Sequence, residues 1–181
     1  MTVGNNERYF GDSTLGWWAA LGRTGKERHG MHSMYWEEFE VGGKFVTKGR
    51  TVTEADAANY FGLTGIYLPL FVDEEYAKTT VFGFRVVPGP LTFIISLGLW
   101  IQLGLWDKTG MAFLGMDELR THAPVRHGDT IHCQIEVIGK RETKNPDRGI
   151  LNTRHTTFNQ QNEKVMSWLW TNMVQRRPQG G

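Results

Sequence analysis

Alternating apolar and polar residues in the second half of the chain predict antiparallel β-strands. Within residues 131–137, Ile, Cys, Ile and Val alternate with His, Gln and Glu, which is the period of a strand buried on one face. Similar runs predict further strands at residues 44–52, 151–159 and 165–174. Polar turns at residues 140–149 and 160–162 separate the last three strands. Trp168 and Trp170 should share one face of the final strand.

The middle of the chain predicts helices. Residues 91–105 are apolar on nearly every side, so a helix there must be covered on most of its surface. Pro90 marks its start, because proline in the first turn of a helix loses no hydrogen bond. The run is shorter than the roughly 20 residues that a bilayer requires. We therefore expect a buried helix in a soluble domain and no membrane span.

Two shorter helices should precede this long one. Thr53 can cap a helix that carries Asp56 in its positively polarised first turn and ends near Gly62. Residues 64–70 contain glycine and proline and are expected as a loop, and residues 73–80 can form a second short helix.

This order of elements fits an α+β protein in which a curved antiparallel sheet wraps around one long central helix. A single sheet of this kind leaves strand edges and apolar surface exposed, so we expect pairing into a dimer. The domain should occupy residues 35–175. An N-terminal extension, residues 1–34, precedes it, and a disordered tail, residues 176–181, follows.

Composition narrows the classes of function. The 181 residues carry 20 basic and 19 acidic side chains with no long run of either sign, so no basic stripe for nucleic acid is expected. A single cysteine, Cys133, cannot form an intramolecular disulfide, which fits a reducing compartment. The N-terminal residues lack the pattern of a signal peptide, so the prediction is a cytoplasmic protein.

Five consecutive segments carry a family resemblance: Tyr35–Gly43, Gly49–Asp56, Val72–Lys78, Phe82–Leu91 and Ala123–Thr130. Together they resemble the MaoC-like family, which includes (R)-specific enoyl-CoA hydratases and related dehydratases. The resemblance implies a hot-dog fold and a ligand that is an acyl-CoA or a carrier-protein thioester. It also implies a homodimer, or a hetero-oligomer with another hot-dog chain, without cofactor or metal.

In active hydratases of this family, the loop after the first helix supplies an Asp and a His that activate water and an Asn that orients the site. The resemblance places Ile66 at the Asp position, Leu68 at the Asn position and Phe71 at the His position. None of these side chains can take a proton or orient a hydroxyl group, and water addition needs such a group. The family dyad is therefore absent from this chain, and its catalytic residues are unknown.

The resemblance also suggests which residues bind the ligand. One part is the apolar loop, and the other is the start of the long helix, where the family receives its thioester. The predicted binding residues are Gly65, Ile66, Leu68, Pro69, Phe71, Val87, Pro88 and Gly89.

Other polar residues have simpler interpretations. Imidazoles at the edge of a sheet are more often solvated or structural than catalytic, and acids at the start of a helix stabilise its positive end. The imidazoles are those of His122 and His127, and the acids are Asp73 and Glu74. Tyr67 has a hydroxyl beside the apolar loop but is more simply a packed side chain, and Asp129 follows Gly128 in an expected turn. Arg85 could meet an anion, although a surface arginine is the more common case. His29 and His32 have no carboxylate or thiolate partner in sequence, so we expect no metal site there.

Two functions of different classes remain open. One is a lyase of the hydratase or dehydratase type, acting on an acyl thioester through non-standard catalytic groups. The other is a non-catalytic subunit of a hetero-oligomeric hydratase or dehydratase, or an acyl-binding module. The apolar loop favours the second, and the intact Val87-Pro88-Gly89-Pro90 helix start favours the first.

Overall fold

The computed structural model describes residues 33–178, which belong to one compact unit. In chain order the elements are the 3-10 helix η1 (Trp36–Glu38), strands β1 (Lys44–Val46) and β2 (Arg50–Thr51), helices α2 (Glu54–Thr64), α3 (Pro69–Val72), α4 (Glu74–Lys78) and α5 (Gly89–Ile101), and strands β3 (Gly110–Thr121), β4 (Thr130–Glu142), β5 (Arg148–Phe158) and β6 (Lys164–Gln175). The predicted extension, residues 1–34, lies almost wholly outside the described residues.

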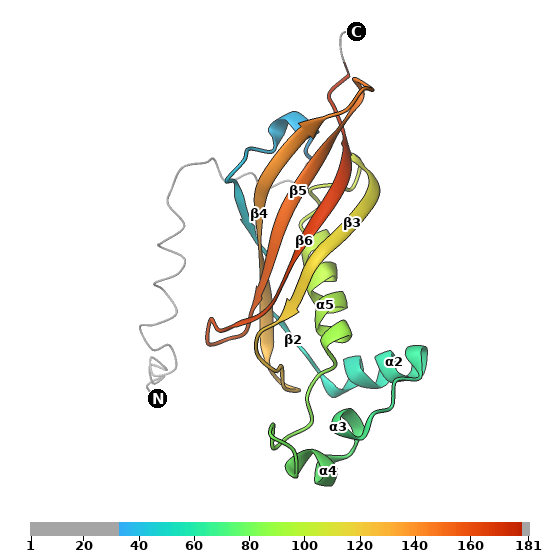
Figure 1. Ribbon diagram of the computed structural model, residues 1–181, viewed down its shortest axis with the longest axis vertical. Coiled ribbons are helices and arrows are strands. Elements are labelled where there is room, and N and C mark those ends of the chain that lie inside the picture. Colours follow the sequence, from blue (N-terminus) through green and yellow to red (C-terminus); the bar gives the residue numbers. More distant parts are fainter. Residues whose placement is uncertain (1–32, 179–181) are drawn as a thin grey trace, which may run out of the picture. The chain divides into compact units, whose positions relative to one another are not determined.

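The strands form one antiparallel sheet. Its order is β1-β4-β5-β6-β3, and β2 pairs with β4 beside β1. Helix α5 runs along one face of the sheet, while α2, α3 and α4 lie beyond the end at which α5 begins (Figure 1). This is a hot-dog fold of the α+β class, as predicted.

Three strand predictions need correction. The expected strand at residues 44–52 is two short strands, because the Cys133 N–H donates to the Thr47 hydroxyl (2.9 Å) and the backbone ladder is interrupted there. The strand β4 is longer than predicted and takes up part of the expected turn at residues 140–149. The strand β3 was not predicted at all. Its pairing with β6 shifts register at three places, and each shift breaks the period of two by which a strand is recognised.

The helices begin close to where the sequence placed them. Thr53 caps α2: its hydroxyl accepts from the Asp56 N–H (3.2 Å), and the Asp56 carboxylate accepts from the Thr53 N–H (2.8 Å). The helix ends at Thr64, two residues later than expected, and Gly65 follows with φ +69°. Residues 69–72, partly predicted as loop, form the short helix α3.

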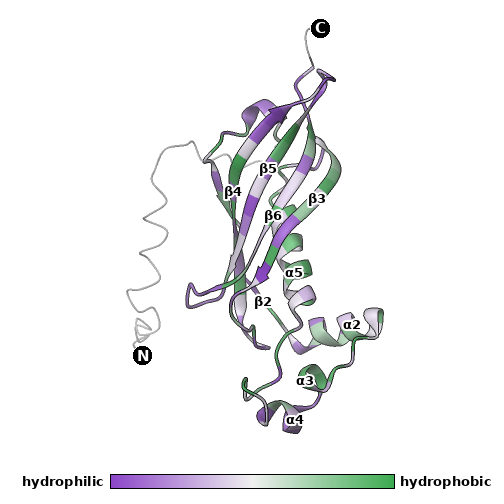
Figure 2. Ribbon diagram, viewed as in Figure 1, coloured by the Kyte–Doolittle hydropathy of each residue, from purple (hydrophilic) through white to green (hydrophobic). Residues whose placement is uncertain are grey.

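Helix α5 is shorter and less covered than predicted. It ends at Ile101, because the N–H groups of Leu103 and Gly104 turn to carbonyls three residues back and Gly104 adopts φ +70°. The residues buried on one side are Leu91, Thr92, Ile95, Ser96, Leu99 and Trp100. On the other side Ile94 is 51% and Ile101 49% exposed, so one apolar side of the helix stays open in a single chain. Figure 2 shows that most of α5 is hydrophobic.

Aromatic rings fill the space between α5 and the sheet. The imidazole of His155 on β5 stacks on Trp168 with ring centroids 4.9 Å apart and meets the edge of Trp100 at 5.0 Å. Its Nε2 lies 2.8 Å from the Thr153 hydroxyl oxygen, while its Nδ1 has no hydrogen-bond partner. Burial lowers the pKa of His155 to about 3, because the charged ring would lose its hydration.

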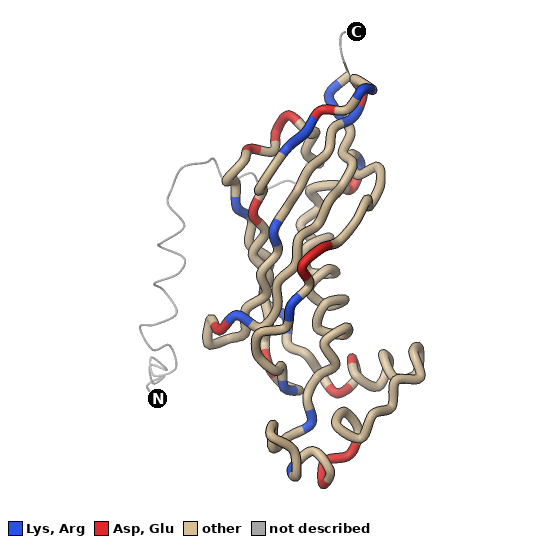
Figure 3. The backbone as a smooth tube through the Cα atoms, in the orientation of Figure 1, with Lys and Arg blue, Asp and Glu red and all other residues tan. Residues whose placement is uncertain are grey.

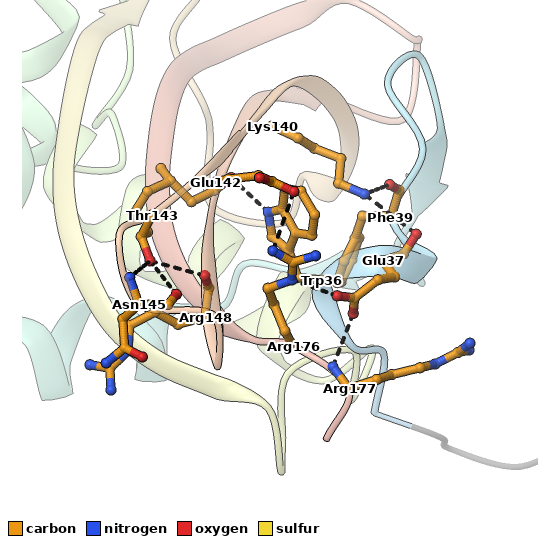
Figure 4. A network of polar contacts seen from close by, with 11 residues as sticks. Trp36, Glu37, Phe39, Lys140, Glu142, Thr143, Asn145, Arg148, Arg176 and Arg177 are labelled. Carbon is orange, nitrogen blue, oxygen red and sulfur yellow. Dashed lines mark hydrogen bonds and ion pairs between the residues drawn. The ribbon is translucent and has the colours of Figure 1, made fainter. Parts of the chain in front are cut away.

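At the far end of the sheet, η1 is held by a network around Trp36 (Figure 4). Lys140 and Arg176 lie over the indole ring, at 4.1 Å and 4.8 Å from its centroid, and Arg176 also pairs with Glu37 (2.7 Å). The ring lies directly on Gly149, where a Cβ would come within 2.5 Å of it. Only glycine lets the indole approach so closely, so this position joins the start of the domain to β5 and β6.

The buried imidazole of His155 predicts a pH-dependent stability. The unfolded chain takes up a proton near pH 6.5 and the folded chain only near pH 3, so the free energy of unfolding should be highest above pH 6.5. It should fall as the pH drops towards 3, by about 5 kcal/mol at 1.4 kcal/mol per pKa unit. Chemical denaturation at several pH values measures this dependence.

The variant His155→Gln should lose most of this slope, and His122→Gln, at an exposed histidine, should keep it. Equal slopes in the unmodified protein and His155→Gln would contradict the assignment.

Candidate binding site

The start of α5 is held against the loop between β3 and β4. Val86 and Arg126 form an isolated antiparallel bridge, and the Val87 N–H donates to the Val125 carbonyl (2.8 Å). Pro88 then caps the helix, whose first internal bond runs from the Thr92 N–H to the Pro88 carbonyl (3.0 Å). These bonds bring the first helical residue, Gly89, close to the end of β3.

An apolar cavity of about 260 Å³ lies beside this helix start. Its wall comes from the approach to α5, the first turn of α5, the β3–β4 loop and the start of β6. The lining residues are Phe82, Val86, Val87, Gly89, Thr92, Thr121, His122, Ala123, Pro124, Val125, Val165 and Met166. Such a cavity, apolar with a few polar groups at one side, is typical of small-molecule sites.

The helix start gives the cavity a polar feature. The first N–H groups of an α-helix have no partner within the helix and carry a partial positive charge. Pro90 has no N–H, and Leu91 is buried and does not line the cavity, so Gly89 supplies the donor that the first turn of α5 can offer there. A carbonyl oxygen placed at this N–H would need no help from a charged side chain.

His122 is the one lining residue with an ionisable side chain. Its Nε2 lies 2.9 Å from the Ser167 hydroxyl oxygen on β6. Partial burial and, to a smaller extent, the nearby Lys164 lower the pKa of His122. The ring is therefore neutral at pH 7 and able to accept a proton, although it is exposed and tied to Ser167.

The structure divides the predicted binding residues between two places. Val87 and Gly89 line the cavity, and Pro88 joins them in the chain as the helix cap. The five loop residues are not among its lining residues and lie instead on the α2–α3 connection: Gly65, Ile66, Leu68, Pro69 and Phe71.

The side chains of this connection are apolar and largely open to solvent. Ile66 is 37% and Leu68 53% exposed, and Tyr67 packs its ring against Phe61 at 5.6 Å. Phe71 is partly buried and stacks on the same Phe61 ring at 6.5 Å. The three residues that the family resemblance sets at the catalytic positions, Ile66, Leu68 and Phe71, are thus all apolar.

Arg85 is paired with carboxylates of two helices. Its guanidinium pairs with Glu54 at the start of α2 (2.6 Å) and with Glu74 at the start of α4 (2.9 Å). His127 lies against the same cluster, with Nδ1 3.9 Å from the Glu54 carboxylate and both ring nitrogens buried without hydrogen bonds. The cluster therefore fixes α2 and α4 to the segment before α5.

The remaining candidate acids have structural roles. Asp73 caps α4 by accepting from the Tyr76 N–H (3.0 Å), and Asp129 closes a turn by accepting from the Arg126 N–H (2.7 Å). His29 and His32 lie outside the described residues. Among residues 33–178, no three His, Cys, Asp or Glu side chains gather as metal ligands, and acidic and basic residues are interspersed along the chain (Figure 3). Within the same residues, no helix has both the length and the apolar character needed to span a bilayer.

Sequence reasoning missed two walls of the cavity, residues 121–125 and residues 165–166. The first overlaps the segment Ala123–Thr130 that carries part of the family resemblance, so a signal was present. No sequence signal distinguishes Val165 and Met166 from other strand residues. They reach the cavity because β6 pairs with β3.

Comparison with known proteins agrees with this geometry. Residues 38–159 match the family model described as the MaoC like domain. The chain is 33% identical over 126 residues to Protein MaoC of Klebsiella aerogenes, covering 70% of this chain and 36% of that protein. It is 33% identical over 106 residues to an (R)-specific enoyl-CoA hydratase of Rhodospirillum rubrum, covering 58% and 70% respectively.

A solved structure gives the same result. The crystal structure of the MaoC-like dehydratase from Rhodospirillum rubrum superposes with a TM-score of 0.73 at 30% identity, covering 81% of this chain and all of that chain (100%). The protein has the hot-dog fold of the hydratases and dehydratases and belongs to the MaoC-like domain family. It spans about a third of the length of the Klebsiella protein (36%).

The apolar α2–α3 connection predicts weak hydratase activity. General acid–base assistance is worth about 10²–10⁴-fold in rate, so the purified protein should hydrate crotonyl-CoA or longer trans-2-enoyl-CoA far more slowly than an ordinary hydratase. Loss of the enoyl-thioester absorbance measures the rate. The triple variant Ile66→Asp, Leu68→Asn, Phe71→His should recover some activity, and each single variant none. Turnover at the level of an ordinary hydratase by the unmodified protein would contradict the vacancy of the dyad.

Proposed function

We propose that the protein binds an acyl-CoA or related acyl thioester in the cavity at the start of α5, as a MaoC-like protein whose site lacks the Asp/His dyad. The observation that carries this proposal is the apolar cavity at the start of α5, whose wall includes Gly89, the first residue of the helix. A thioester carbonyl fits the Gly89 N–H, and an acyl chain fits the apolar wall. The name of the Rhodospirillum relative, an (R)-specific enoyl-CoA hydratase, supports this class of ligand.

The chemistry that such a site could perform is limited. Binding and polarisation of the thioester need only the backbone of α5, whereas proton transfer needs a side chain. The dyad positions are apolar, and His122 is the single lining group that could move a proton near neutral pH. Our proposal is therefore a hydratase or dehydratase of low intrinsic activity, in the cytoplasm and without cofactor.

A second candidate, a non-catalytic subunit in a hetero-oligomer with another hot-dog chain, is favoured by the exposed apolar side chains of the α2–α3 connection. Ile66 and Leu68 would be costly to leave in water, and a partner chain could cover them. In that arrangement the partner would supply the acid–base groups.

We also propose that the chain pairs with a second hot-dog chain through the outer edge of β3. Among the described residues, β3 has β6 on one side and no strand on the other. Its exposed apolar side chains are Met111, Phe113, Leu114 and Leu119. A free edge with apolar side chains favours pairing with another strand, and the open side of α5 would gain cover in the same assembly.

Binding is tested at Gly89. A Cβ there would meet only the Thr121 methyl group, at 3.4 Å, so Gly89→Leu should leave the fold intact while its longer side chain fills the cavity. Calorimetric titration with hexanoyl-CoA, a saturated thioester that cannot be hydrated, should show binding by the unmodified protein and at least a tenfold loss in the variant. The matched control is Gly62→Leu, at an exposed helix position with open space around it.

No binding by the unmodified protein, or equal binding by Gly89→Leu, would remove the proposed thioester site.

Pairing is tested by light scattering coupled to size exclusion. The unmodified protein should run as a dimer at micromolar concentration, and Leu114→Glu should shift it towards monomer because a charge would enter the interface. Leu63→Glu, at an exposed residue of α2 away from β3, is the control and should leave the dimer unchanged. If the unmodified protein is a monomer, the test is repeated with a second hot-dog chain added. A monomer that also fails to pair with that chain would contradict the proposed edge contact.

A further inference from the structure

His122 lies between the apolar cavity and the solvent. The residue is exposed, yet it belongs to the wall of the cavity at the start of α5. The other histidines between residues 33 and 178 are held elsewhere: His127 against α2, His132 on the ring of Phe158 and His155 in the core. His122 is therefore placed to exchange a proton both with bulk water and with a ligand in the cavity.

The backbone brings this histidine close to the start of α5. Its N–H donates to the Val165 carbonyl on β6 (2.8 Å), directly after β3 ends at Thr121. Thr121 in turn lies against the helix start, since a Cβ at Gly89 would meet its methyl group at 3.4 Å. The base in the cavity wall and the N–H that can polarise a carbonyl therefore come from segments in contact.

A serine fixes the orientation of the ring. Nε2 of His122 lies 2.9 Å from the hydroxyl oxygen of Ser167, which follows Met166 of the cavity wall on β6. Within residues 33–178 the ring has no second hydrogen bond, so Nδ1 has no protein partner there. A hydroxyl group can accept from an Nε2–H or donate to a bare Nε2. Rotation of the Ser167 hydroxyl therefore lets Nδ1 be either the proton-accepting nitrogen or the proton-bearing one.

The surroundings of the ring favour its neutral form. Partial burial and, to a smaller extent, the positive charge of Lys164 on β6 lower the pKa of His122. Among the described residues, no carboxylate forms an ion pair with the ring that would oppose these effects. The imidazole is thus a base at pH 7 and becomes an acid once it has taken up a proton.

We propose that His122 is the catalytic acid–base group of the apolar cavity and that Ser167 is its positioning residue. His122 lies on the β3–β4 loop, whereas the family resemblance points to the α2–α3 connection, where residues 66, 68 and 71 are apolar. This inference rests on the proposed function and names the side chains that would perform its chemistry.

The proposed step balances without a further reactant. The oxygen of a water molecule bonds to the β-carbon of an enoyl thioester, and a proton of that water passes to Nδ1 of His122. The electron pair of the double bond moves towards the thioester oxygen, where the Gly89 N–H stabilises the developing charge. The imidazolium then gives its proton to the α-carbon, so one water is added and His122 returns to its neutral form.

The first test replaces the imidazole. His122→Gln keeps a polar side chain but cannot take up a proton at neutral pH. Hydration of crotonyl-CoA, followed by chromatography of the product, should lose about a hundredfold in kcat with less than about a twofold change in KM. His132→Gln is the matched control, because His132 lies on β4 outside the cavity wall, and it should change neither parameter.

The pH profile identifies the titrating group. A base works only in its neutral form, so kcat/KM of the unmodified protein should rise with pH and level off below pH 6.5, since the pKa of His122 is lowered from 6.5. This rise should be absent in His122→Gln. A mere loss of packing would lower the rate at every pH and leave the rise in place.

The second test separates the hydroxyl group of Ser167 from the size of its side chain. Threonine and valine have the same shape and both suit a strand, but only threonine has a hydroxyl. Ser167→Val should lower kcat by about threefold to tenfold, the effect of one hydrogen bond, and Ser167→Thr should retain most of the activity. Thermal unfolding of each variant verifies that the fold is kept.

The outcomes separate this inference from the proposed function. An unchanged rate and pH profile in His122→Gln would overturn the role of His122, and so would an unmodified protein that binds hexanoyl-CoA in calorimetry but hydrates no crotonyl-CoA. Both results would leave the proposed binding site standing. Equal activities of Ser167→Val and Ser167→Thr would overturn the role of Ser167. Absence of hexanoyl-CoA binding would overturn the proposed function itself, and with it the substrate on which His122 would act.

Discussion

Helix α5 packs one side against the inner face of the sheet through Leu91, Ile95 and Leu99, with the rings of Trp100, Trp168 and His155 filling the space between. Burial of this apolar surface is the largest favourable contribution available to the domain. It also determines where the first turn of α5 lies, because the helix cannot slide along the sheet without opening the aromatic contacts. The position of Gly89 against the end of β3 follows from this packing.

The cavity forms where this packing stops. At the N-terminal end of α5, strand β3 ends and the β3–β4 loop begins. The segment that leads into α5 is joined to that loop by the Val86–Arg126 bridge. The gap between them is bordered by apolar side chains and by the backbone N–H of Gly89, which the helix itself cannot satisfy. The position of this cavity therefore depends on the backbone pairing at the start of α5 as well as on the side chains that line it.

The α2–α4 region is attached differently. Arg85 joins Glu54 and Glu74 from two helices. In addition, Ala57, Tyr60 and Phe61 of α2 bury their side chains in the main hydrophobic core. Phe71 packs against this core, whereas Ile66 and Leu68 are exposed.

Much of this architecture could be predicted from the sequence, because it depends on local patterns. The alternation in residues 131–137, the cap at Thr53 and the proline at position 90 each act within a few residues, and all three predictions are confirmed in position. The family resemblance gave the hot-dog fold. The strand β3 was missed since its bulges remove the local period, and the break between β1 and β2 depends on a hydrogen bond from Cys133, 86 residues away from Thr47.

The sites depended on tertiary structure for the same reason. The residues Val165 and Met166 join Gly89 in one cavity only because β6 pairs with β3. The sequence by itself determined which chemical groups are present, including the apolar side chains at positions 66, 68 and 71. The tertiary structure alone decided which of the remaining groups meet, because contacts between distant segments form through burial and strand pairing, which no local pattern encodes.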